Sequence, residues 1–259
     1  MTMTESFDGC RLNVQSEGPS DAPVVMLSHH LGGSLQVWDV LAEALRNRVR
    51  IVRYDTRGQG SSEASDGPYS IEMLGRDALA VVAALNLQRV DFIGLSQGGM
   101  TGMWLAANHP EKIQRLVLAN TTPFIPNKPI WDELIAKAQS QGMDDIAVST
   151  LEGWLSPGFK VRDPAGVQAL IETMRHMSPK GYAGNCAVLR DVDLRNRLSD
   201  IVCSTLVIGG AEDGSRGAAG PVMASGVRDG KLVIIERAAH LSAVENAQDF
   251  NRAIEEFLT

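Results

Sequence analysis

The chain has 259 residues, of which 44% are hydrophobic and 21% are charged, and its formal net charge is −7. This length and composition are ordinary for one large globular α/β domain with room for an inserted subdomain. The acidic balance predicts no nucleic-acid footprint, which needs a clustered basic face, and no attraction to an anionic membrane surface.

Short apolar runs alternate with helix-period segments along the chain. Strands are predicted, in order, at residues 24–27, 50–54, 90–93, 116–119, 205–208 and 231–235, and an antiparallel edge strand is expected at residues 11–15. Amphipathic helices are predicted at residues 37–45, 71–85 and 99–107, and a C-terminal helix from about residue 246. Uniformly apolar strands separated by helices are typical of a mostly parallel sheet with both faces covered.

The alternation breaks between residues 121 and 197, where no strand is predicted and six prolines punctuate helical segments. An all-helical insert between two strands of such a sheet predicts a cap over the ligand crevice at the carboxyl ends of the strands. The expected division is therefore a core of residues 1–120 and 198–259 and a helical cap of residues 121–197. Trp131 and Trp154 of the cap either line the pocket or belong to a small core of the cap itself.

A Gly-x-Ser-x-Gly pattern at residues 94–98 joins a predicted strand to a predicted helix. In this context the pattern predicts a nucleophile elbow, because glycines leave room beside a serine held on a tight, strained turn. The helix that follows favours negative charge developing near its first N–H groups. We therefore expect Ser96 to be a catalytic nucleophile.

A serine nucleophile needs a base. Of the five histidines, His240 is expected in this role because it follows the last predicted strand and precedes the C-terminal helix. His109 precedes a proline at a helix exit, where a structural role is favoured, and His176 lies in the predicted cap.

The base in turn needs an acid that orients it. Asp213 lies in the glycine-rich loop after the strand at residues 205–208, where a short carboxylate suits a tight turn better than the adjacent Glu212. The competing position after the strand at residues 116–119 holds Asn120, which has no carboxylate. The chain order of serine, aspartate and histidine is the order expected for a hydrolase of this architecture.

The tetrahedral intermediate of acyl transfer also needs N–H donors around its oxyanion. One is expected from the backbone of Gln97, directly after the nucleophile, and the other from Leu31, in the loop after the strand at residues 24–27. His29 and His30 of that loop could be mistaken for metal ligands. No third ligand is positioned by the sequence, so no metal site is predicted.

The three cysteines, Cys10, Cys186 and Cys203, are widely spaced and odd in number. This pattern predicts neither a disulfide framework nor a metal site and is typical of a reducing compartment. The N-terminus lacks the apolar stretch of a secretory signal, and no run approaches the length of a membrane span. We therefore expect a cytoplasmic protein; the sequence predicts no particular oligomeric state.

The predicted elbow, the triad order and the segment Arg-Tyr-Asp-Thr-Arg-Gly-Gln-Gly at residues 53–60 resemble the α/β-hydrolase superfamily. Residues 181–193 of the predicted cap are similar, more closely, to the 3-oxoadipate enol-lactonases of bacterial aromatic catabolism. The likeness covers nearly the whole chain. One departure lies in the oxyanion loop, where His29-His30 replaces the usual His-Gly of the superfamily and the Asn-Ser frequent in these lactonases.

The resemblance implies an α/β-hydrolase fold and hydrolysis of 3-oxoadipate enol-lactone through an acyl-enzyme on Ser96. It implies no cofactor and no metal, because an enol is a good leaving group and the oxyanion hole carries the charge. The substrate bears a free carboxylate, which calls for a cation or several N–H donors. Arg190 is favoured for this role, and Trp131 and Trp154 would wall the ring. Other cations of the predicted cap are Arg175, Lys180 and Lys160.

Two other functions fit the same residues. The nearer alternative is a generic carboxylesterase or cofactor-free perhydrolase, which would hydrolyse short neutral esters without preferring acidic lactones. The remote alternative is a ligand receptor on a hydrolase scaffold, which would turn over no activated ester. A nucleophilic aspartate, as in dehalogenases and epoxide hydrolases, is excluded by Ser96.

Overall fold

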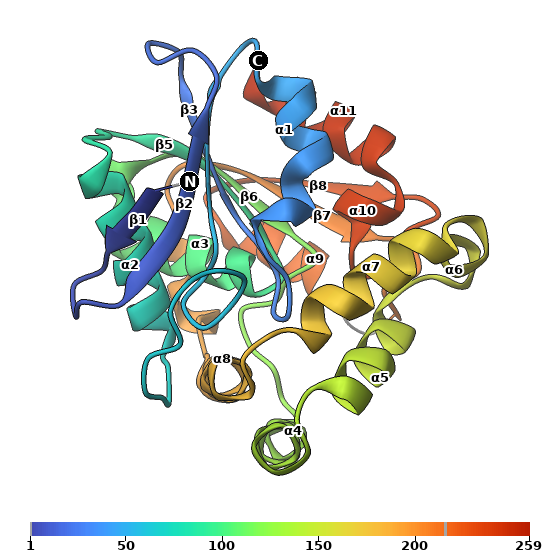
Figure 1. The fold of residues 1–259 in the computed structure, drawn as a ribbon. Helices are drawn as coiled ribbons and strands as arrows, with labels where there is room; N and C mark the ends of the chain where they lie inside the picture. Colours follow the sequence, from blue (N-terminus) through green and yellow to red (C-terminus); the bar gives the residue numbers. More distant parts are fainter. Residues whose placement is uncertain (1, 215–216) are drawn as a thin grey trace.

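The computed structural model of the chain, which describes residues 2–214 and 217–259, contains an eight-stranded sheet in the order β1-β2-β4-β3-β5-β6-β7-β8 (Figure 1). The strands are β1 (Thr2–Glu5), β2 (Arg11–Glu17), β3 (Val24–Ser28), β4 (Arg50–Tyr54), β5 (Val90–Leu95), β6 (Ile113–Ala119), β7 (Ser204–Gly210) and β8 (Asp229–Ile235). The pairs β1–β2 and β2–β4 are antiparallel, and all neighbours from β4 to β8 are parallel. The carboxyl ends of the parallel strands therefore meet at one edge of the sheet.

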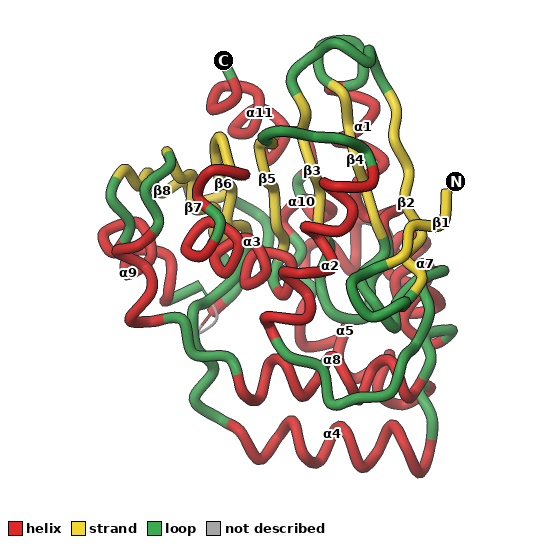
Figure 2. Tube along the Cα trace, turned by 90° about the vertical axis from the view of Figure 1, so that its left-hand side faces the viewer, coloured by secondary structure: helices red, strands yellow, loops and turns green. Residues whose placement is uncertain are grey.

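Helices cover both faces of the sheet. Both views place α1 (Asp39–Leu45) and α11 (Ala247–Leu258) on one face, and α2 (Ile71–Ala84), α3 (Gln97–Asn108) and α9 (Ala219–Gly226) on the other (Figures 1 and 2). The central strand β5 is buried along its whole length, as expected for a strand covered on both sides. A short helix, α10 (Ser242–Glu245), precedes α11.

Five helices form an insert between β6 and β7, gathered at one end of the molecule in both views (Figures 1 and 2). They are α4 (Lys128–Gln141), α5 (Asp144–Trp154), α6 (Pro157–Arg162), α7 (Pro164–Arg175) and α8 (Pro179–Asp191). Four of them carry a proline in the first turn. Proline lacks a backbone N–H, and N–H groups in the first turn have no acceptor within the helix, so no hydrogen bond is lost there. The prolines of the insert therefore begin helices more often than they interrupt them.

The predicted fold class is confirmed, and each predicted strand is present, several of them longer by up to three residues. Outside the insert, the strand β1 and the helices α9 and α10 were not predicted. The strand β1 is short and polar and is fixed by pairing with β2, and α9 is rich in glycine and alanine. The three cysteines are free and buried, as expected for small apolar side chains. The domain boundaries at residues 121 and 197 remain a prediction.

The loop after β4 is held rigidly beside the carboxyl edge of the sheet. Asp55 accepts hydrogen bonds from the backbone N–H groups of Leu35 at 2.7 Å and Ser61 at 2.8 Å. Arg57, whose side chain is fully buried, forms an ion pair with the equally buried Asp77. Removing one partner of a buried ion pair strongly destabilises the folded protein. This pair therefore fixes the path of the loop.

Candidate active site

Ser96 lies between the end of β5 and the start of α3 with φ 54° and ψ −113°, a backbone conformation that is strained for a serine. Neighbouring glycines make the turn possible. A Cβ on Gly94 would lie 2.2 Å from the carbonyl oxygen of Gly98, and a Cβ on Gly98 would lie 2.1 Å from that of Ser28. The predicted elbow is thus present in the backbone geometry.

His240 joins Ser96 to Asp213. Its Nε2 lies 3.0 Å from Ser96 Oγ, and its Nδ1 lies 3.1 and 3.2 Å from the two carboxylate oxygens of Asp213. A carboxylate only accepts, so Nδ1 carries the proton and Nε2 can accept the proton of the serine hydroxyl. The three side chains come from the loops after β5, β7 and β8, and all three residues are buried.

Asn120 supports the acid from the loop after β6. Its Nδ2 donates to Asp213 Oδ2 at 3.1 Å and to the carbonyl oxygen of Ala239 at 2.8 Å, and its Oδ1 accepts from the hydroxyl of Ser242. From the sequence, this position is expected only as a competing place for the acid. Its location after the strand next to β7 was the one signal that it would face Asp213.

The loop that carries His240 is clamped to the helical insert. The buried carboxylate of Glu245 accepts from the N–H groups of Ala239 at 3.0 Å, Leu241 at 3.1 Å and Ser156 at 2.8 Å, the last of which lies between α5 and α6. The N–H of His240 itself donates to the carbonyl oxygen of Trp154 at 3.0 Å. Sequence reasoning did not identify Glu245, because backbone donors leave no motif.

Trp154 packs between the two histidine rings at this edge. Its ring centroid lies 4.9 Å from that of His240 and 5.8 Å from that of His30, with the second pair edge to face. The predicted wall residue Trp154 therefore lies against His240, the predicted base. Trp131 lies on α4, and its buried indole N–H donates to no described residue.

The two histidines of the oxyanion loop are fixed as neutral rings. Burial lowers the pKa of His30 to about 3, and its Nδ1 donates to the carbonyl oxygen of Leu31 at 2.8 Å. Burial also lowers the pKa of His29, whose Nδ1 donates to the carbonyl of His30 while Nε2 accepts from the N–H of Thr56. Both rings thus shape the loop. Over residues 2–214 and 217–259, no group of three or more His, Cys, Asp or Glu side chains has a metal-binding arrangement.

The two predicted oxyanion donors flank the elbow. Gln97 is the first residue of α3, so its N–H has no acceptor within the helix. Leu31 follows β3, and its N–H donates to no other residue in the described part of the chain. Two backbone donors without protein acceptors at the carboxyl edge of the sheet are the groups that an oxyanion requires.

Arg190 is not brought to the triad by any hydrogen bond or ion pair. Its guanidinium binds Asp132 and Asp191, each at 2.7 Å. The other cations considered for the substrate carboxylate also face acidic side chains. Arg175 pairs with Asp144 and Glu172, Lys180 with Asp66, and Lys160 with Glu152. Any of them would have to exchange an existing partner to bind a carboxylate, so this role of Arg190 stays a prediction.

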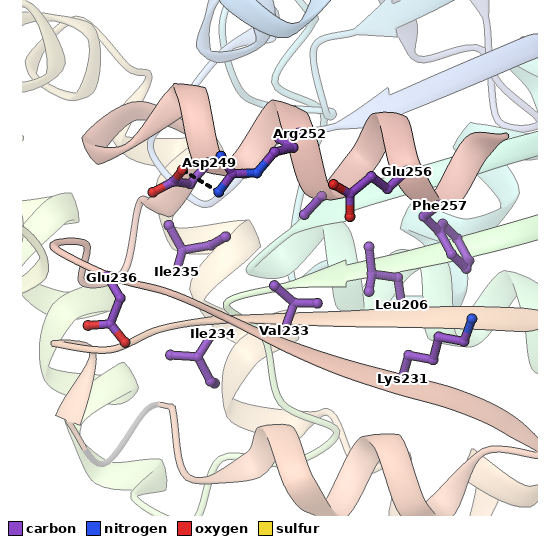
Figure 3. Close-up of a pocket in the computed structure, with 11 residues that line it drawn as sticks. Leu206, Lys231, Val233, Ile234, Ile235, Glu236, Asp249, Arg252, Glu256 and Phe257 are labelled. Carbon is purple, nitrogen blue, oxygen red and sulfur yellow. Dashed lines mark hydrogen bonds and ion pairs between the residues drawn. The ribbon is translucent and has the colours of Figure 1, made fainter.

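A separate hollow of about 450 Å³ lies between α11 and the strands β7 and β8 (Figure 3). Its walls carry both signs of charge, including an ion pair of 2.7 Å between Arg252 and Asp249. None of the residues that line it belongs to the predicted catalytic set. It is therefore a groove at the edge of the sheet and no extension of the site around Ser96.

Fold and site together define a class of protein. A parallel sheet that presents a serine at a strand–helix elbow, with an aspartate and a histidine after later strands, is typical of α/β hydrolases. Residues 23–147 match the family described as alpha/beta hydrolase fold, and the chain belongs to this family. None of the helices within the described ranges has the length and hydropathy to cross a membrane.

Within that family the chain is similar to enol-lactonases. It is 34% identical to 3-oxoadipate enol-lactonase 2 of Acinetobacter baylyi, over 94% of this chain and 91% of that protein. It is 30% identical to 3-oxoadipate enol-lactonase 1 of the same organism, over 96% and 93%. The crystal structure of the enol-lactonase from Burkholderia xenovorans matches with a TM-score of 0.96 at 34% identity, over 99% of both chains. The predicted resemblance is confirmed.

Proposed function

We propose that this protein hydrolyses 3-oxoadipate enol-lactone to 3-oxoadipate, as a cytoplasmic enzyme in the catabolism of protocatechuate or catechol. One observation carries the proposal. Ser96 Oγ lies 3.0 Å from His240 Nε2, with Asp213 on the other ring nitrogen, in a chain whose enol-lactonase relatives match nearly end to end.

In the first half of the reaction, Ser96 Oγ attacks the lactone carbonyl while His240 Nε2 accepts its proton. The N–H groups of Leu31 and Gln97 stabilise the oxyanion. The bond between the carbonyl carbon and the ring oxygen breaks, and the enolate leaves. His240 returns its proton to the enolate, which becomes the ketone, and the acyl group remains on Ser96. Asp213 stabilises the imidazolium without taking its proton.

In the second half, water attacks the acyl carbonyl while His240 Nε2 accepts a proton from it. The bond to Ser96 Oγ breaks, the serine recovers its proton from the imidazolium, and 3-oxoadipate is released. No step of this scheme requires a metal or an organic cofactor. The ring of the substrate would lie against Trp154 and Trp131, and Arg190 would bind its carboxylate by exchanging one of its two acidic partners.

The test follows the loss of absorbance of 3-oxoadipate enol-lactone beside the hydrolysis of p-nitrophenyl acetate. We expect rapid loss of the lactone, much slower acetate hydrolysis, and loss of both activities in Ser96→Ala. The control Ser225→Ala removes an exposed hydroxyl from α9 and should leave both unchanged. Good acetate turnover with an inert lactone would instead indicate a carboxylesterase or perhydrolase, and no turnover of either would favour a ligand receptor.

A further inference from the structure

A continuous chain of amide hydrogen bonds crosses the base of the candidate site. The N–H of Gly32 donates to Gln59 Oε1 at 2.6 Å, and Gln59 Nε2 donates to Gln97 Oε1 at 3.0 Å. Gln97 Nε2 in turn donates to the carbonyl oxygen of Asn185 at 3.3 Å. Gln59, Gln97 and Asn185 are each exposed by 1% or less. This series of hydrogen bonds thus joins the loop after β3, the loop after β4, the elbow and helix α8 of the insert.

The chemistry at the two ends fixes the direction of every bond in this chain. At one end the Gly32 N–H can only donate, so the oxygen of Gln59 must face it. At the other end the Asn185 carbonyl can only accept, so the NH₂ group of Gln97 must face that residue. The amide of Gln59 then has one orientation that satisfies both of its neighbours. A carboxylate or an apolar side chain at this position would satisfy at most one of them.

Both ends of the Gln59 side chain adjoin residues of the oxyanion hole. Gly32 directly follows Leu31, and Gln97 supplies the other N–H. We propose that Gln59 is a positioning residue that sets the separation of the two oxyanion donors, an inference that rests on the oxyanion hole of the proposed function. The donors must lie about 2.7–3.1 Å from the oxyanion, and losing one donor costs roughly 10²–10³ in kcat. Loss of the brace should cost less, because both donors remain.

Gln59 can act as a brace because its own backbone is held by contacts other than those of its side chain. Asp55 and Arg57 bind the ends of the loop through the contacts described above. Gln59 also donates its backbone N–H to the carbonyl of Thr56 at 2.9 Å. The side chain therefore projects from a backbone that is held at several points, including the bond from the Thr56 N–H to His29 of the oxyanion loop.

The test compares Gln59→Met and Gln59→Glu, which nearly preserve the volume, with Gln139→Glu, which adds the same charge on the exposed side of α4. Activity is measured with p-nitrophenyl acetate, and transition-state binding with phenylboronic acid, which forms a tetrahedral adduct on a catalytic serine. We expect kcat to fall about 10- to 100-fold with KM within twofold. Boronate affinity should fall by the same factor as kcat/KM. The control should match wild type in all of these measurements.

Unchanged kcat, or a loss of kcat without a loss of boronate affinity, would overturn the proposal. If the Gln59 variants do not fold, Gln97→Met breaks the chain from the other side while it keeps the backbone N–H, and the same pattern is expected. An inert lactone with normal acetate turnover would refute the substrate of the proposed function and leave this test intact.

Discussion

Asp91 should destabilise the fold when it is ionised. It lies near the amino end of β5, opposite Arg115 of β6, and its side chain is 8% exposed. Its Oδ1 has no hydrogen bond from a described residue, and Arg115 Nε is 3.9 Å away. Burial raises the pKa of Asp91 from its ordinary value of 3.8 to about 6, against the opposing charges of Arg115 and Arg89. The folded protein therefore favours the protonated carboxyl.

The sign follows from proton linkage. A pKa raised by folding gives stability that is complete below about pH 3.8 and is lost as the pH rises through about 6. At 1.36 kcal/mol for each pH unit, the loss amounts to about 3 kcal/mol above pH 7. Asp91→Asn removes the charge and should recover much of that amount, roughly 1–3 kcal/mol after the cost of burying an amide.

Urea unfolding of wild type and Asp91→Asn at pH 5 and pH 8 measures this effect. The stabilisation by the variant should be larger at pH 8 by about 1 kcal/mol, because wild type has already lost part of the stability at pH 5. Ester hydrolysis should not change, since Ser96 is five residue steps from Asp91 along the extended strand, roughly 16 Å away. Equal stabilisation at both pH values, or a less stable variant at pH 8, would refute the reasoning.

Three further predictions concern the support of the triad. In Glu245→Gln, the new amide NH₂ group faces a backbone N–H that now donates to the carboxylate, so kcat/KM should fall about tenfold. The control Glu133→Gln, at an exposed position, should have no effect. Asn120→Ala removes a donor from Asp213 and should lower both kcat/KM, about tenfold, and Tm; an unchanged Tm would argue against the buried network. Because the pKa of His30 is about 3, His30→Asn should leave the acidic limb of the pH–kcat/KM profile in place, and a shifted limb would show that His30 titrates during catalysis.

The triad could be predicted from sequence because its members lie just after apolar strands. Parallel strands that follow one another along the chain bring their carboxyl ends to one edge, so Ser96, Asp213 and His240 converge without any knowledge of their distances. The strand β1 could not be predicted in the same way, because its polar residues are held by pairing with β2 and carry no apolar pattern of their own.

The supporting residues were missed for a different physical reason. Asn120, Glu245 and Gln59 each bond at least one backbone group that lies close in space but far along the chain, and such partners impose no spacing on the sequence. The two acidic partners of Arg190 show the same limit. Asp191 is its neighbour in the sequence, whereas Asp132 lies 58 residues away on another helix. The sequence therefore does not reveal that Asp132 neutralises Arg190, the cation favoured for the substrate carboxylate.

The hydrogen bonds between the insert and the His240 loop restrict which inserts of related hydrolases could replace this one. Two of the contacts run from the carbonyl of Trp154 to the N–H of His240 and from the N–H of Ser156 to the carboxylate of Glu245, and in both the insert contributes main-chain atoms. A third uses a side chain, because Arg162 of α6 donates to the carbonyl oxygen of Glu245. A chimera that receives the insert of a relative can keep the two main-chain bonds if its backbone follows the same path near residues 154–156, but it keeps the third only with a donor side chain at position 162. The two main-chain bonds therefore restrict the length of this part of the insert more than its composition, and an insertion of one residue there would displace the loop that carries His240.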